Sequence, residues 1–284
     1  MITVFTSTYN RAYLLPRLYE SLKKQTFKDF EWLIVDDGST DGTRDLVDGW
    51  IKEKLIDIRY YYQENGGKHR AINRGAQLAK GEWFFIVDSD DYLPEISLDV
   101  SNKWMKSVED DDSFAGVCGL KELNGWTPEV AFDMIDLNPL RNNELFRGDK
   151  AEIIKTNVLK KYPYPDIPGE KFCAESLIWV SIGLYYNVRY FNEVICCCEY
   201  LEDGLTKNSL KNRRKNPTYA SIIYSEQMKH LPTMKEKVRA AINYWRFVWF
   251  TKRFPKFEGI SGFAYFFLPI GLLFCLIDYL IVKE

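Results

Sequence analysis

This chain of 284 residues has few histidines, and it has no glycine-rich phosphate-binding pattern of the common kinds. The only two histidines, His69 and His230, offer little material for a histidine-rich metal site or a Ser-His-Asp triad. Neither the Gly-x-Gly-x-x-Gly pattern nor the Walker A pattern occurs, which argues against dehydrogenases and P-loop ATPases. We therefore expect carboxylates to carry any chemistry.

The cysteines form no disulfide pattern, and the first residues do not resemble a leader segment. Three of the six cysteines are consecutive, at 196–198, where strand neighbours point to opposite faces, so we expect reduced packing residues. No basic region and apolar run with a small-residue cleavage site precedes the first strand-like segment. The expected location is the cytoplasm.

Short apolar runs alternate with amphipathic stretches in the first part of the chain. Strands are predicted at 2–6, 32–35, 58–62 and 83–87, with helices at 13–24 and 70–80 between them. This alternation predicts an α/β fold with a mostly parallel sheet flanked by helices. Residues 121–150 read as an irregular loop on the acceptor side, and periodicity returns with a helix at 175–186 and one or two strands at 188–200.

Acidic residues follow two of the predicted strands. Asp36 and Asp37 precede a small-residue turn, which a plain helix-capping turn would also explain. Asp88, Asp90 and Asp91 place three carboxylates within four residues, a clustering of like charge that a bound cation would stabilise. Parallel strands bring both ends to one edge of the sheet, so together they predict a site for a nucleotide and a metal.

A third segment, 65–73, opens a helix with Gly66 and Gly67 followed by Lys68 and Arg70. Backbone amides after glycines at a helix N-terminus can approach a phosphate, and the basic side chains add positive charge. A strand-to-helix turn with a solvated basic face is the alternative.

These blocks occur in order: Ser7-Thr8-Tyr9-Asn10-Arg11, Gln25-Thr26 to Phe30-Glu31, Val35-Asp36-Asp37-Gly38-Ser39 and Asp88-Ser89-Asp90-Asp91. They resemble a family 2 glycosyltransferase of the GT-A, Rossmann-like fold. The resemblance is specific over residues 2–94 and weaker from there to about residue 206.

The resemblance implies roles for individual residues. Thr6, Tyr9 and Asp37 would hold the nucleoside, with Tyr9 against the base and Asp37 accepting a hydrogen bond from a uracil-like imide. Lys68 would sit near the donor. Asp88 would face the ribose or the metal, and Asp90 would be the principal ligand of Mn²⁺ or Mg²⁺, hard ions that suit carboxylates and phosphate oxygens.

The segment from Gly169 to Trp179 resembles the place where the family carries its catalytic base, usually an acidic pair that opens a helix. Ser176 replaces the second acid of that pair, which leaves Glu175 as the expected base and Glu170 as the reserve. Glu175 would alternatively favour the helix N-terminus only through its charge. Residues 203–206 resemble the family's loop that closes over the donor.

The expected activity is inverting transfer of a sugar from a nucleotide diphosphate sugar, a UDP-sugar, to an acceptor hydroxyl, in surface polysaccharide or glycoconjugate synthesis. A sugar nucleotidyltransferase is the second reading, although the glycine-rich loop such enzymes carry after the first strand is absent. A non-catalytic binding protein that retains the fold is the third.

The expected catalytic domain covers 1–206, and 207–284 forms a helical extension. From 207 to 257 there are 13 Lys or Arg residues against two acids, interleaved with aromatics, and the segment 262–282 is apolar apart from Asp278. Asp278, Pro269 and Gly271 argue against a clean transmembrane span, and a buried helical hairpin is the alternative. Cations and aromatics beside an apolar segment favour a peripheral enzyme on the inner face of the cytoplasmic membrane, with a lipid-linked or oligosaccharide acceptor. Binding to nucleic acid is not expected, because the first part of the chain is acidic.

Overall fold

The computed structural model of the protein describes residues 1–140, 150–199, 208–251 and 262–281. By packing, the chain divides into two compact units, each described by itself. The first contains residues 1–163 and 185–200, and the second contains residues 164–184 and 201–284.

The first unit is built on one mixed sheet with the strand order β3-β2-β1-β4-β7-β5-β8-β6. The strands are β1 (Ile2–Thr8), β2 (Phe30–Asp36), β3 (Asp57–Tyr62), β4 (Trp83–Ile86), β5 (Phe114–Leu123), β6 (Met134–Leu137), β7 (Lys150–Lys155) and β8 (Asn187–Cys198). The pairs β1–β2, β1–β4, β2–β3 and β5–β8 are parallel, whereas β4–β7, β5–β7 and β6–β8 are antiparallel. Strands β1 to β5 and β8 therefore all end at the same edge of the sheet.

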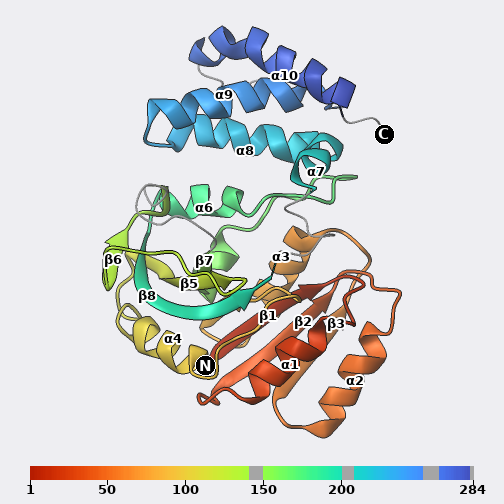
Figure 1. Cartoon of the computed structure of the whole chain (residues 1–284), viewed down its shortest axis with the longest axis vertical. Helices are drawn as coiled ribbons and strands as arrows, with labels where there is room; N and C mark the ends of the chain where they lie inside the picture. The colour runs from red at the N-terminus through yellow and green to blue at the C-terminus, as the bar shows by residue number, and fades with distance from the viewer. Residues whose placement is uncertain (141–149, 200–207, 252–261, 282–284) are drawn as a thin grey trace. The chain divides into compact units, whose positions relative to one another are not determined.

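Helices cover both faces of this sheet (Figure 1). Helices α1 (Leu15–Lys23) and α2 (Thr43–Glu53) lie on one face, where Tyr19 and Trp50 stack with centroids 4.4 Å apart against buried Trp32 of β2. Helix α3 (Lys68–Leu78) lies on the other face, and α4 (Ser97–Lys106) and α5 (Thr156–Lys161) complete the unit. Gly75 lets α3 approach β1, since a Cβ there would lie 2.2 Å from the ring of Phe5.

The predicted α/β fold with a mostly parallel sheet is confirmed, and each predicted strand and helix has a counterpart. Strands β5, β6 and β7 were not foreseen, and parts of them lie in the stretch interpreted as an irregular loop from 121 to 150. The residues from 141 to 149 lie outside the described residues. Cys196, Cys197 and Cys198 are buried thiols on β8 that form no disulfide.

The second unit is helical. Its elements are α6 (Ser176–Gly183), α7 (Ser209–Lys215), α8 (Pro217–His230), α9 (Met234–Val248), the 3-10 helix η2 (Gly262–Phe267) and α10 (Leu268–Ile281). Helices α8, α9 and α10 lie side by side (Figure 1). A capping box of Thr233 and Glu236 begins α9, and Tyr224, Tyr244, Trp245 and Phe247 fill the core.

Pro269 does not break the apolar C-terminal segment, because it stands in the first turn of α10, where its missing N–H is not needed. The packing units divide the chain differently from the predicted boundary at residues 206 and 207, because 164–184 packs with the helices. Packing clusters are not domain boundaries, so that boundary stays a prediction.

Candidate functional site

The loop after β2 is fixed by its own acids. Asp36 is almost fully buried, accepting hydrogen bonds from Ser39 N at 2.7 Å and from the hydroxyl of Tyr60 at 2.5 Å. Gly38 has φ +92°, and a Cβ there would lie 2.7 Å from the backbone nitrogen of Asn65. The loops after β2 and β3 therefore pack directly against each other.

Asp37 holds these two loops together. One carboxylate oxygen accepts from Gln63 Nε2 at 2.7 Å and from Gly66 N at 2.9 Å. The other accepts from Asn65 Nδ2 at 3.2 Å and from Gly67 N at 2.7 Å. Four donors fill the lone-pair positions of the carboxylate. The predicted contact between Asp37 and a uracil-like base stays a prediction, and one of these donors would have to yield to it.

The same bonds bear on the predicted phosphate site at the start of α3. Gly66 N and Gly67 N point at Asp37, so these amides are already used. The guanidinium of Arg70 donates to the carbonyl of Gly66. The ammonium of Lys68, which is also predicted to lie near the donor, faces the acidic loop after β4 instead.

The two remaining predicted nucleoside contacts differ in exposure. Thr6 is fully buried in β1, where its hydroxyl donates to Val87 O at 2.9 Å and accepts from Trp32 Nε1 at 3.0 Å. Tyr9, just past the end of β1, is 49% exposed and available to stack on a planar group. A role for Thr6 at the nucleoside stays a prediction that its present bonds do not favour.

The loop after β4 gathers charge of both signs. Lys68 Nζ lies 2.6 Å from Asp88 Oδ1, and Lys121 Nζ lies 2.6 Å from Asp91 Oδ2. No lysine or arginine among the described residues forms an ion pair with Asp90, whose carboxylate is partly exposed. Asp90 is thus the acid in this loop whose charge the protein leaves for another cation.

The pKa shifts follow these contacts. Burial opposes the charge of Asp88, but the ammonium groups of Lys68 and Lys121 outweigh it and lower the pKa of Asp88. Burial, together with the charge of Asp88, raises the pKa of Asp90. Burial also raises the pKa of Asp91, to about 6, although Lys121 counteracts the rise. Asp88 is the acid most firmly held in its charged form.

The residues fit a divalent metal only in part. Within the described ranges, no three His, Cys, Asp or Glu side chains come together as a metal cage. Asp88 and Asp90 offer carboxylates at one loop, and carboxylate oxygens are the ligands that Mn²⁺ and Mg²⁺ prefer. Such a pair suits a metal whose other positions are filled by water and diphosphate oxygens, so the two residues fit that kind of site.

The sequence interpretation missed Lys121. It lies near the end of β5, 15% exposed, and its pKa is raised because electrostatic interactions with Cys196, Asp91 and Asp88 outweigh the cost of burial. The stretch was interpreted as the beginning of a loop, yet the apolar run from Phe114 to Leu120 before it could have indicated a strand ending at the same sheet edge.

The two candidate bases lie in the second unit, in different surroundings. Both oxygens of Glu170 accept backbone N–H groups at the start of α8, from Thr218 and Tyr219, each at 2.9 Å. Glu175 is exposed at the N-terminal end of α6, and its side chain makes no capping hydrogen bond there. Glu170 thus caps the start of α8, whereas Glu175 is exposed and does not cap α6.

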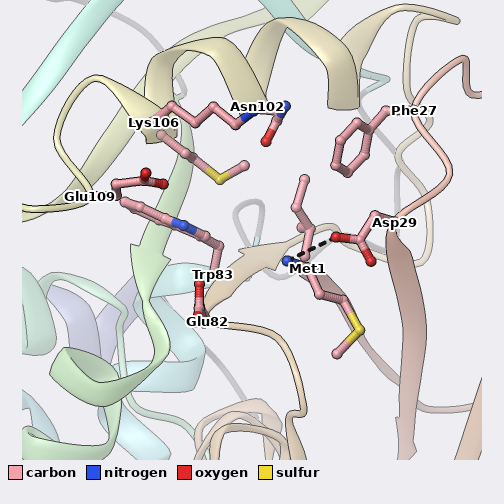
Figure 2. Close-up of a pocket in the computed structure, with 10 residues that line it drawn as sticks. Met1, Phe27, Asp29, Glu82, Trp83, Asn102, Lys106 and Glu109 are labelled. Atoms are coloured by element: carbon pink, nitrogen blue, oxygen red, sulfur yellow. Dashed lines mark ion pairs between the residues drawn. The ribbon is translucent and has the colours of Figure 1, made fainter.

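One cavity of about 180 Å³ lies at the other edge of the sheet. Met1, Asp29 and Trp83 line it at the amino ends of the strands, and Lys106 of α4 closes one side (Figure 2). The amino group of Met1 lies 3.1 Å from Asp29. Because the acidic loops follow the carboxyl ends of β2 and β4, this cavity is separate from the candidate site.

Known proteins match the first part of the chain in sequence. The profile described as Glycosyl transferase family 2 matches residues 3–119. Glycosyltransferase GlyG of Streptococcus pneumoniae serotype 4 is 40% identical over 96 residues, which are 34% of this chain and 32% of that protein. A PGL/p-HBAD biosynthesis glycosyltransferase of Mycobacterium bovis is 38% identical over 98 residues, 34% of this chain and 37% of that protein. The chain thus spans about a third of the length of these curated relatives.

Solved structures match nearly the whole chain in fold. TarS 1-349 of S. aureus in complex with UDP-GlcNAc gives a TM-score of 0.65 at 18% identity and covers 95% of this chain and 79% of that one. Mannosyltransferase PcManGT from Pyrobaculum calidifontis, in complex with GDP-Man and Mn²⁺, gives 0.59 at 17% identity and covers 100% and 88%. Residues 3–119 therefore match the glycosyl transferase family 2 profile, and the chain has the GT-A fold of these solved structures.

Proposed function

We propose that the chain transfers a sugar from a nucleotide diphosphate sugar, a UDP-sugar, to an acceptor hydroxyl with inversion at the sugar carbon. The observation that carries the proposal is the loop after β4, where Asp88 and Asp91 each pair with a lysine and Asp90 pairs with none of the described lysines. This loop stands at the carboxyl edge of the sheet, inside the part of the chain that matches the family.

In this proposal Asp88 and Asp90 would hold Mn²⁺ or Mg²⁺ beside the donor diphosphate. When bound, the cation neutralises charge that develops on the departing diphosphate. Lys68 pairs with Asp88 at 2.6 Å, and its ammonium would donate to the diphosphate of a bound donor. Lys121 remains paired with Asp91 and holds the loop after β4 to β5.

The nucleoside would lie against the exposed ring of Tyr9, beside the loops that Asp37 holds together. Two solved structures of TarS contain UDP and UDP-GlcNAc, whereas PcManGT contains GDP-Man. We propose a UDP-sugar as the donor, and a GDP-sugar is the alternative that the test below distinguishes.

Glu175 is the proposed base. The acceptor oxygen attacks the sugar carbon from the face opposite the diphosphate, the bond from that carbon to the phosphate oxygen breaks, and Glu175 takes the hydroxyl proton. Its exposed place at the start of α6 supports this role, while Glu170 is occupied with α8. One displacement of this kind inverts the sugar carbon.

The acceptor is proposed to be lipid-linked or an oligosaccharide in surface polysaccharide or glycoconjugate synthesis, with the protein on the inner face of the cytoplasmic membrane. The basic, aromatic C-terminal part supports this location, and the excess of acids over cations outside that part disfavours nucleic acid.

The test is a screen of nucleotide sugars with Mn²⁺ and with EDTA. It measures released nucleotide and the mass of any glycosylated product. UDP release that depends on the metal is expected. GDP release would replace the donor, pyrophosphate release would favour a nucleotidyltransferase, and donor binding without turnover would favour a binding protein.

A pair of variants tests the base. Glu175→Gln should keep donor affinity and lower transfer by about 100- to 10,000-fold. Glu170→Gln should instead lower the free energy of unfolding, because it weakens the cap of α8. The roles of base and structural residue would be exchanged by a different pair of results. In that case Glu175→Gln would lose donor binding, and Glu170→Gln would lose transfer while it stayed as stable as the unmodified chain.

A further inference from the structure

One narrow stripe of η2 and α10 is seated on α9. Its buried members, Ala264, Gly271 and Asp278, recur every seven residues, which is two helical turns. Trp245 of α9 donates from Nε1 to Ala264 O at 2.7 Å. A Cβ at Gly271 would lie 2.3 Å from Cβ of Trp245, so a glycine is required for this close contact.

The end of this stripe is fastened by charge. Asp278 is 3% exposed and accepts two hydrogen bonds from the guanidinium of Arg246, at 2.6 and 2.7 Å. Arg214 of α7 donates to Asp278 O at 2.9 Å. The one acid in the apolar segment is therefore neutralised against α9, and α10 keeps a defined orientation.

The rest of the segment is apolar and exposed. Only 17% of the segment 262–280, which is apolar and long enough to cross a membrane, is buried. The exposed side chains are Tyr265, Phe266, Ile270, Leu273, Phe274, Leu276, Ile277, Tyr279 and Leu280. Helix α9 differs, since its exposed positions include Lys235 and Arg239. A continuous apolar surface of this size is typical of an interaction site.

Positive charge borders this surface. Helix α7 has Lys211, Arg213, Arg214 and Lys215 among its seven residues, none of them buried, and Arg214 brings it to the last turns of α10. The described residues from 208 to 281 contain nine Lys or Arg against three acids, one of which is Asp278. Exposed tyrosines stand near both ends, at 265 and 279. Cations and interfacial aromatics around an apolar surface complement an anionic lipid layer.

The contacts on α9 oppose a spanning orientation. A spanning α10 would carry the last turns of α9 into the hydrocarbon with the charged pair of Arg246 and Asp278, because Gly271 and Asp278 contact Trp245 and Arg246. Charged side chains at that depth are strongly disfavoured. A helix lying in the plane of the interface leaves α9 on the water side.

We propose that the outer face of η2 and α10 lies flat in the interfacial layer of an anionic membrane, with the α7 cations at the lipid headgroups. The biological purpose of this docking rests on the proposed function, since the docked enzyme would then work beside a lipid-linked acceptor. The docking itself depends on α7, α9 and α10 alone.

The experiment measures sedimentation of the full chain with vesicles of phosphatidylcholine alone and of phosphatidylcholine with phosphatidylglycerol in equal parts. The double variant Leu276→Ser, Leu280→Ser should bind the anionic vesicles at least about 100-fold more weakly, given roughly tenfold for each lost leucine. Leu55→Ser is the matched control, because Leu55 is 60% and Leu276 61% exposed. It should bind as the unmodified chain does.

Further arms decide the mode of binding. Lys211→Gln with Lys215→Gln should weaken binding to the anionic vesicles and leave any binding to phosphatidylcholine unchanged. Equal binding of the leucine variant and the unmodified chain would overturn the proposal. Retention in vesicles after alkaline carbonate extraction would also overturn it, because that result indicates a spanning helix. A third contrary result is a chain that binds no vesicles but forms a dimer, which the leucine variant dissociates. Vesicle binding without nucleotide release in the donor screen would reject the proposed function and keep the docking.

Discussion

Two strand ends in the first unit carry adjacent aspartates, and the structure uses them differently. After β2, Asp36 and Asp37 together accept six hydrogen bonds through their carboxylates, all from the chain itself. After β4, Asp88 and Asp91 meet lysines, and Asp90 pairs with no cation among the described residues. One residue type at one kind of position thus builds a loop framework in the first case and leaves charge for a ligand in the second.

The comparison predicts its largest effect at Asp90. Asp90→Asn should lower metal-dependent turnover by about 100- to 1,000-fold, because it removes a carboxylate charge that forms no ion pair with a described lysine or arginine. The thermal midpoint should stay the same or rise slightly, since burial and Asp88 disfavour the charged form. Nucleotide release with Mn²⁺ and with EDTA measures the first effect, and calorimetry the second. Near-normal turnover with an unchanged metal requirement would remove Asp90 from the proposed site.

Asp37→Asn should act on stability. An amide presents its own N–H groups to two of the four donors, so Gly66 N and Gly67 N cannot both keep a partner. The expected loss is about 2–3 kcal/mol in the free energy of unfolding. Urea unfolding measures it, with Asp90→Asn as the matched control. If both variants unfolded alike, the two strand ends would not differ as described.

Lys121→Met probes the support beneath the second loop. Removing one partner of a buried ion pair is destabilising, but the pKa of Asp91, raised to about 6, lets that acid take up a proton instead. We expect a loss of about 1–2 kcal/mol, which is less than the usual cost of an unpaired buried charge. Urea unfolding at neutral pH checks it, and Lys121→Met combined with Asp91→Asn should recover part of the loss. No recovery would mean that Lys121 acts through packing alone.

The smallest effect is expected at Lys68, whose ammonium is partly exposed. Lys68→Met should strengthen the binding of Mn²⁺ alone by a few-fold, about 1 kcal/mol or less, because the ion no longer competes with an ammonium for Asp88. The same variant should bind UDP with Mn²⁺ more weakly. Titration calorimetry with and without UDP separates the two. Unchanged affinity for Mn²⁺ alone would show that the Lys68–Asp88 pair does not compete with the metal.

The sequence by itself determined the four strands and two of the three helices in the first 90 residues, together with the loops that carry acids, but not α2. Periodicity and strand ends are local properties, and parallel strands bring their ends to one edge wherever they pair. It also indicated that the C-terminal third is basic, aromatic and apolar in turn, because composition requires no coordinates.

Only the tertiary structure decided which of these residues are already occupied. Thr6, Asp37 and Glu170 resemble site residues in sequence, yet each is hydrogen bonded to groups from elsewhere in the chain. Lys121 pairs with Asp91, 30 residues away in the sequence, and Arg246 pairs with Asp278, 32 residues away. These ion pairs define the structural roles of the two cations. Hydrogen bonds and ion pairs between distant segments depend on how strands and helices pack, and a local pattern contains no record of that packing.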